Sequence, residues 1–180
     1  RLPIWIGAGG TPQSAVRAGE AGLPLNLANI GGEPARFRPF IELYRRTGLA
    51  AGHARADLRV AISGHLHVQR DDQRARDEFF GHYSRYMRHN LPQRDQGWQV
   101  GRPDYEFLAG PTGSLFVGSP QRIVDKILYE HELFGHDRFL AQIDIGGLPY
   151  DKVAQAIELL ATEVLPAVRR ALARAETLPG

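Results

Sequence analysis

Short β-prone runs alternate with helical segments along the chain, and glycines follow the runs. The runs cover residues 4–6, 25–28, 58–63 and 139–145. Between them lie segments whose apolar residues recur at helical spacing. Strands that alternate with helices predict βαβ units, a parallel sheet and right-handed crossovers. The sequence therefore predicts an α/β fold with about four βα units.

The number of units limits which architecture they can build. The chain has 180 residues, of which 43% are apolar, and this is enough for one globular domain over residues 1–180. A complete eight-stranded (βα) barrel needs at least about 200 residues. Two architectures remain open on this count, an open doubly wound sheet and half of a TIM-type (βα)8 barrel.

One stretch lacks a clear period. Residues 91–118 are rich in Gly and Pro but contain Trp98, Tyr105 and Phe107. A connection of this length predicts a lid or insertion loop, whose aromatic residues either cover a ligand or anchor the loop to the core. The last helix is expected from about residue 151, with a kink or break at Pro166.

Composition excludes several classes of function. The chain has no cysteine, which excludes disulfides, thiolate metal sites and cysteine nucleophiles. It has no apolar run of about 18 residues and no signal-like start, so we expect a cytoplasmic protein without a membrane span. Its 22 basic residues are scattered among 20 acids, so we expect no nucleic-acid partner. Because the chain starts with arginine and its only methionine is Met87, we expect a processed product or a piece of a longer protein.

The sharpest local motif is the glycine turn, residues 7–12, with the sequence Gly-Ala-Gly-Gly-Thr-Pro. It lies where the first run passes into a helix that Thr11 can cap. Backbone amides at a helix N-terminus favour an anion, and glycines allow a phosphate to approach closely. The motif is neither a P-loop nor a dinucleotide fingerprint. A phosphate site and a simple tight turn both remain open.

Two histidines follow the third run. His65 and His67 alternate, so in a strand their side chains share one face. Two imidazoles can begin a metal site, but no third ligand is evident nearby, and we expect no metal. A substrate pocket at the mouth of the sheet and a hydrogen-bonded structural pair both remain open.

Several segments, taken in order, are similar to the bacterial luciferase-like, flavin-dependent monooxygenase family. The first are PIWIGAGGTPQSA at 3–15 and AGLP at 21–24, followed by VGSP at 117–120 and FGHDRF at 134–139. The last are GGLP at 146–149, IELL at 157–160 and EVLP at 163–166. The similarity extends to about residue 169.

This resemblance implies an eight-stranded (βα) barrel of which the chain is the C-terminal half. It implies FMN, or a deazaflavin in some branches, and a small organic substrate, with reduced flavin supplied by a separate reductase or carried by the coenzyme. The loop Ala8, Gly9, Gly10 and Thr11 is then expected to hold the flavin phosphate. Residues Ala28, Asn29 and Ile30 are expected beside the flavin ring.

The resemblance also implies that part of the active site lies elsewhere. In the family, the substrate pocket and the acid–base histidine belong largely to the N-terminal half, so no catalytic residue is assigned in this chain. A second hypothesis is a non-catalytic half-barrel that binds flavin or another phosphate ligand. Because a half-barrel leaves two sheet edges and an apolar face open, we expect the chain to form homo-oligomers.

Overall fold

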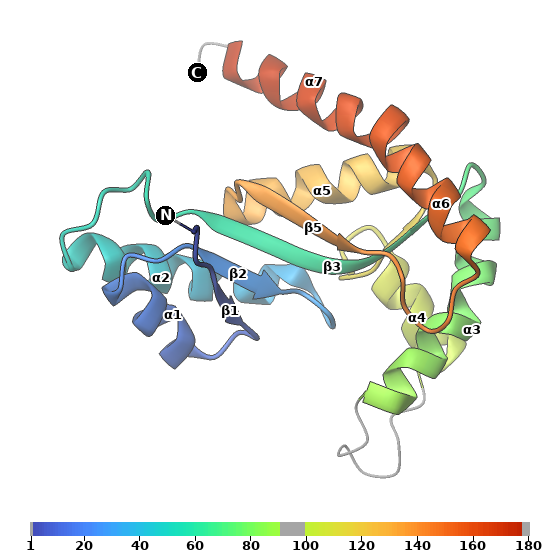
Figure 1. The fold of residues 1–180 in the computed structure, drawn as a ribbon, viewed down its shortest axis with the longest axis horizontal. Helices are drawn as coiled ribbons and strands as arrows, with labels where there is room; N and C mark the ends of the chain where they lie inside the picture. The colour runs from blue at the N-terminus through green and yellow to red at the C-terminus, as the bar shows by residue number, and fades with distance from the viewer. Residues whose placement is uncertain (1, 91–99, 178–180) are drawn as a thin grey trace.

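A computed structural model describes residues 2–90 and 100–177 and shows parallel strands alternating with helices (Figure 1). The strands are β1 (Ile6–Ala8), β2 (Leu25–Ala28), β3 (Val60–Val68), β4 (Phe116–Gly118) and β5 (Arg138–Gln142). The first helices are α1 (Pro12–Glu20), the 3-10 turn η1 (Pro34–Phe37), α2 (Arg38–Ala50), α3 (Asp72–Asn90) and α4 (Arg102–Ala109). They are followed by α5 (Pro120–Phe134), α6 (Tyr150–Leu159), the π-helical turn η2 (Leu160–Val164) and α7 (Leu165–Thr177).

Strand β3 is the centre of the sheet. It pairs with β2 through Val60–Ser63 and with β5 through Ala61–His65, and its last three residues pair with β4. Strand β1 pairs with β2, and every pairing is parallel. The expected α/β fold with a parallel sheet is therefore confirmed.

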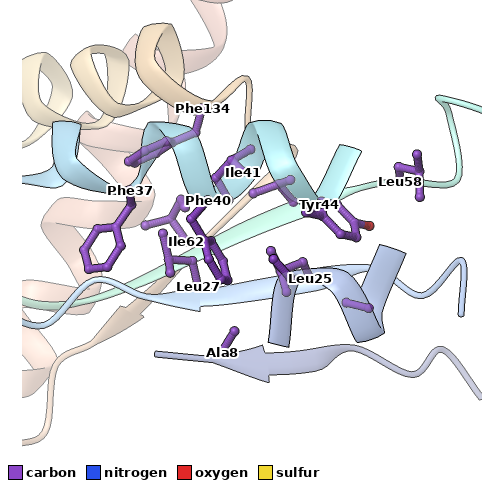
Figure 2. Close-up of a cluster of buried hydrophobic side chains, with 13 residues drawn as sticks. Ala8, Leu25, Leu27, Phe37, Phe40, Ile41, Tyr44, Leu58, Ile62 and Phe134 are labelled. Carbon is purple, nitrogen blue, oxygen red and sulfur yellow. The ribbon is translucent and has the colours of Figure 1, made fainter. Parts of the chain in front are cut away.

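Helices α1, α2, α5 and α7 form a layer in the same order as the strands that they cover. The amphipathic helix α2 shows why, because Phe40, Ile41 and Tyr44 recur at helical spacing and all are buried. They pack on Leu25 and Leu27 of β2 in the core drawn in Figure 2. One face of β1, β2 and β3 therefore carries the apolar residues of this core.

Helices α3 and α4 lie instead beyond the carboxyl-terminal end of β3 (Figure 1). The apolar stripe predicted for the third helix is buried here, with Phe79, Tyr83 and Met87 in one cluster with Tyr105 of α4. Helix α5 contacts β3 and β4 and follows α3 and α4 in the chain, so α3 and α4 form an insertion that precedes the crossover helix. The helical layer leaves the other face of the sheet for this insertion and for the site.

The region 91–118 holds more regular structure than its sequence pattern indicates. Residues 102–118 contain α4 and β4, neither of which was predicted as an element. Tyr105 is buried and donates its hydroxyl to the Arg76 carbonyl, so it anchors α4 to α3, whereas Phe107 is exposed. Trp98 lies outside the described residues, and the lid stays a prediction.

The C-terminal helix changes its winding just before Pro166, where a kink or break was predicted. Residues Leu160–Val164 form a π-helical turn between α6 and α7. Proline lacks the amide hydrogen that an α-helix requires at this point, which explains the interruption. None of the helices in the described ranges, 2–90 and 100–177, is both long and apolar enough to cross a membrane.

Close packing of α1 on α2 gives a test of the fold. A Cβ at Gly19 would lie 2.7 Å from the Tyr44 carbonyl oxygen and 3.0 Å from the Gly48 nitrogen. Although alanine favours a helix by about 1 kcal/mol, overpacking against backbone costs about 1–3 kcal/mol. We expect Gly19→Ala to lower the free energy of unfolding in urea by up to about 2 kcal/mol.

Gly81 provides the matched control for this variant. It lies within α3, is exposed, and a Cβ there meets no atom within 4 Å. Gly81→Ala should therefore raise the free energy of unfolding by up to about 1 kcal/mol. Equal effects of the two substitutions would contradict the packing of α1 on α2.

Candidate functional site

The glycine turn lies at the edge of the sheet where the parallel strands end. Strands β1 and β2 are neighbours, so the residues after Ala8 and after Ala28 meet at the same edge. Gly10 has φ +95°, a conformation that favours glycine, and the Phe37 ring packs directly beneath it. This conformation turns the chain sharply from β1 into α1.

The N-terminus of α1 is open toward solvent. Thr11 precedes the helix without capping it through its side chain, and its Oγ1 lies 2.8 Å from the Ser14 Oγ. The first turn of α1 contains no acidic residue, and a Cβ at Gly9 meets no atom within 4 Å. Backbone amides, two hydroxyls and free space therefore converge at the positive end of a helix dipole, which is the chemistry an anion requires.

A second helix with the same local sequence begins differently. Gly118, Ser119 and Pro120 precede α5 as Gly10, Thr11 and Pro12 precede α1. The Ser119 side chain accepts a hydrogen bond from the Arg122 amide, and the Asp72 carboxylate accepts from the Ser119 amide at 3.1 Å. Asp72 also pairs with the Arg122 guanidinium. The start of α5 is therefore neutralised by the protein itself, whereas the start of α1 is not.

The residues after β2 divide between the two faces of the sheet. Ala28 pairs with Ser63 of β3, and Ile30 is 39% exposed. Asn29 is fully buried and donates from Nδ2 to the Glu130 Oε1 of α5 at 2.6 Å. Its side chain therefore points toward the helical layer, as does that of Ala8, which belongs to the core. Of the expected flavin contacts, Gly9, Gly10, Thr11 and Ile30 reach the open edge with their side chains or backbone, and Ala28 is partly exposed on the same face of β2 as Ile30.

His65 and His67 lie within β3, because this strand continues to Val68 and not only to the predicted Ser63. Both side chains face α3. His65 contacts the edges of the Tyr83 and Tyr86 rings at centroid distances of 5.8 and 5.0 Å, and His67 stacks on Phe79 at 5.3 Å. The pair therefore lies at the carboxyl end of β3, beneath the aromatic face of α3.

The environment of the two imidazoles keeps them neutral. Burial lowers the pKa of His65 to about 4, and its Nδ1 has no hydrogen-bond partner. Burial also lowers the pKa of His67, although the hydrogen bond from its Nε2 to the Glu78 Oε2 at 3.3 Å opposes this effect. A neutral His67 thus carries its proton on Nε2 and leaves Nδ1 as a free acceptor.

Glu78 connects His67 to polar groups that the sequence pattern did not single out. Its carboxylate also accepts from the Gln69 amide at 2.9 Å and from the Lys152 ammonium at 2.8 Å. Burial raises the pKa of Glu78, but the bonds from Lys152 and His67 outweigh it and lower the pKa below its usual value. Within residues 2–90 and 100–177, no group of three or more His, Asp or Glu side chains is placed to hold a metal ion.

Sequence reasoning also missed a buried polar pair on α5. Lys126 and Glu130 fall among the apolar positions of α5, and both are buried. The only signal in the sequence is that charged residues occupy positions where helical periodicity predicts apolar ones. Gln142 and Asp144, also considered from the sequence, are exposed near the end of β5, where Gln142 pairs with His65 of β3.

A comparison with protein families shows to which family the chain belongs. A family model described as luciferase-like monooxygenase matches residues 1–137. The chain belongs to the luciferase-like monooxygenase family. The matched residues include the glycine turn, β1 to β4 and the histidine pair. No curated protein sequence matches the chain.

Solved structures show the fold of which this chain is a part. It resembles monooxygenase RslO1 from Streptomyces bottropensis with a TM-score of 0.73 and 23% identity, covering 92% of this chain and 48% of that one. It also resembles the coenzyme F420-dependent tetrahydromethanopterin reductase from Methanopyrus kandleri, with a TM-score of 0.65 and 21% identity, covering 92% of this chain and 50% of that one. A third similar structure is the FMN complex of the oxygenating constituent of 3,6-diketocamphane monooxygenase from Pseudomonas putida. Its TM-score is 0.63 at 21% identity, and the match covers 91% of this chain and 48% of that one.

The chain thus spans about half the length of these structures. This coverage, together with the parallel sheet and its single helical layer, confirms half of a TIM-type barrel over the open doubly wound alternative. One of these structures is named for its dependence on coenzyme F420, and another is a complex with FMN. A flavin-type cofactor is therefore supported for the family to which the chain belongs.

Burial of His65 predicts a contribution to acid sensitivity. The folded-state pKa, about 4, lies below the unfolded value of about 6.5, so the unfolded chain binds the proton first. Stability from His65 is therefore complete above pH 6.5 and is lost as the pH falls toward 4. In urea unfolding from pH 7 to pH 4.5, His65→Phe should lose about 2 kcal/mol less stability than the wild type. Parallel curves for the two proteins would contradict the burial of a neutral imidazole.

Proposed function

We propose that this chain provides the flavin-phosphate loop of an FMN-dependent monooxygenase that oxidises a small organic substrate with dioxygen. The observation that carries the proposal is the open N-terminus of α1. Gly9 leaves space there, and the Thr11 and Ser14 hydroxyls lie together beside amides that no side chain of the first turn caps. Membership in the luciferase-like monooxygenase family supports a flavin phosphate as this anion.

The contrast with α5 supports the choice of α1. Both helices begin after a glycine and a hydroxyl residue followed by proline, but Asp72 already occupies the start of α5. A phosphate at α5 would compete with this carboxylate for the Ser119 amide and for Arg122, whereas the first turn of α1 contains no acidic residue. The electrostatics therefore favour one of two otherwise similar loops.

Ile30 and Ala28 then provide the surface beside the flavin ring. Ile30 is 39% exposed at the edge of the sheet, next to the loop of α1, and its apolar side chain suits a ring face. Asn29 acts through the backbone, because its amide donates to the Ser63 carbonyl at 2.9 Å while Glu130 holds its side chain. These bonds fix the position of the loop.

The bound cofactor supplies the redox chemistry, and the protein positions it and excludes water. Reduced FMN from a separate reductase is the cofactor of this proposal, and a deazaflavin, which works without dioxygen, is the alternative. His65 and His67 are proposed to line the substrate side of the site. Both imidazoles are neutral and covered by aromatic rings of α3, so they add no charge to that side of the site.

Loss of one hydroxyl tests the phosphate loop. Thr11→Ala removes a donor that can form one charge-assisted hydrogen bond, worth about 1–2 kcal/mol. We expect the Kd of FMN to rise about 5- to 30-fold, measured by fluorescence titration. Riboflavin lacks the phosphate, so its affinity should not change in the variant.

Ser119→Ala is the matched control, because it alters the equivalent hydroxyl at the neutralised start of α5. It should leave FMN affinity unchanged. If Thr11→Ala binds FMN as the wild type does, or weakens riboflavin equally, the loop has only a structural role. Parallel titrations with a deazaflavin coenzyme and assays of oxygen uptake then distinguish the two cofactor branches.

A second candidate function is a non-catalytic flavin-binding half-barrel that associates with itself. The observation that favours it is the open sheet, since β1 and β5 each pair on one side only within the described ranges. Leu140 on β5 is 40% exposed. We expect a dimer or larger assembly in sedimentation at micromolar concentration, because exposed strand edges promote pairing. A monomer would overturn this candidate.

A further inference from the structure

Helix α5 carries an amine and a carboxyl group one turn apart in the interior. Lys126 is 2% exposed and Glu130 is 1% exposed, at positions that face the sheet and α4. Lys126 is one of only two lysines in a chain with 20 arginines. Lysine is almost never fully buried unless it has a partner or a function, so its contacts decide which applies.

The contacts of Lys126 leave much of its hydrogen-bonding capacity unused. Its Nζ donates to the Gly110 carbonyl oxygen at 2.5 Å, at the end of α4, and lies 5.8 Å from the centre of the Phe116 ring. Glu130 does not bond to it, because Oε1 accepts from Asn29 and Oε2 has no partner. The amine and the carboxyl group are therefore buried together without forming an ion pair.

Lys126 also lines a polar cavity of about 550 Å³ between the end of α4 and the first turns of α5. The other walls include the hydroxyl residues Thr112, Ser119 and Tyr129 and the charged residues Asp72, Arg122 and Asp125. Lys126 therefore borders a cavity whose volume admits small molecules. The cavity lies at the neutralised start of α5 and is separate from the open loop of α1.

The surroundings of Lys126 favour the free amine, mainly because the side chain is buried. Burial lowers its pKa to about 7, and Arg122 and Arg76 act in the same direction, whereas Glu130 acts against them. The Gly110 carbonyl and the Phe116 ring also favour the ammonium form, but burial outweighs them. Burial likewise raises the pKa of Glu130 to about 8, which weakens its opposing charge near neutral pH.

We propose that Lys126 is a nucleophilic amine that captures small polar aldehydes in this cavity as a Schiff base. The nitrogen lone pair forms a bond to the carbonyl carbon, and the carbonyl oxygen leaves as water. Both hydrogens of this water come from the amine, so the step needs no oxidant or reductant. The hydroxyl groups of the walls suit a polar aldehyde, and the limited exposure of Lys126 restricts the site to small ones.

The two lysines of the chain make the test unusually direct. Lys152 is the internal reference, because its ammonium pairs with the Glu78 carboxylate at 2.8 Å and its side chain is 22% exposed. The full chain is treated with glycolaldehyde and cyanoborohydride at pH 7, which reduces the Schiff base to a stable amine. Peptide mass spectrometry then compares the two sites. We expect Lys126 to be modified about tenfold faster than the more exposed Lys152.

Two variants show which lysine carries the glycolaldehyde adduct. Lys126→Arg retains a donor for the Gly110 carbonyl but has no amine, so its glycolaldehyde adduct should disappear. Lys152→Arg should leave the modification of Lys126 unchanged. Modification of Lys152 at an equal or higher rate in the wild type, or no modification of Lys126, would overturn the proposal. Neither result depends on flavin binding, so the inference stands or falls independently of the proposed function.

Discussion

The hydrogen-bond ladders of β3 are the constraint on which the rest of the structure depends. All nine residues of this strand are buried, and it pairs with β2, β4 and β5. Its alternation assigns Ile62 and Leu66 to the helical layer and His65 to α3. A register shift of one residue would place the histidines among the apolar helices and expose the aliphatic residues. The same register thus determines both the core and the position of the imidazoles.

Much of the fold was predictable because the spacing of apolar residues along the chain indicates its strands and helices. The alternation of strands and amphipathic helices predicted the parallel sheet, and Pro166 predicted the interruption of the last helix. The pattern failed where tertiary contacts decide the structure. Strand β4 has only three residues and exists through its pairing with the end of β3, which itself extends five residues beyond its predicted end. Such elements lack a period long enough to detect.

In the candidate site, too, the sequence predicts local features, whereas contacts with distant residues determine how single side chains lie. The Gly-Thr-Pro and Gly-Ser-Pro sequences before α1 and α5 indicate the same helix start, and sequence alone cannot separate them. Only the structure brings Asp72, which is 47 residues from Ser119, to the start of α5 and leaves α1 open. Asn29 gives a second example. Its place after β2 was predicted, but the direction of its side chain depends on Glu130, which lies 101 residues away.

Helix α5 joins these features through polar groups that a purely structural helix would not need. Burial of Lys126 and Glu130 without an ion pair costs free energy that apolar residues of similar size would not. The hydrogen bond between Glu130 and Asn29 offsets part of this free energy and fixes the loop after β2. The hydrogen bond from Lys126 to the Gly110 carbonyl attaches the end of α4 to α5. A glutamine and an arginine can form the same bonds. What distinguishes the residues present is that burial lowers the pKa of Lys126 and raises that of Glu130, and perturbed pKa values of this kind are typical of functional sites.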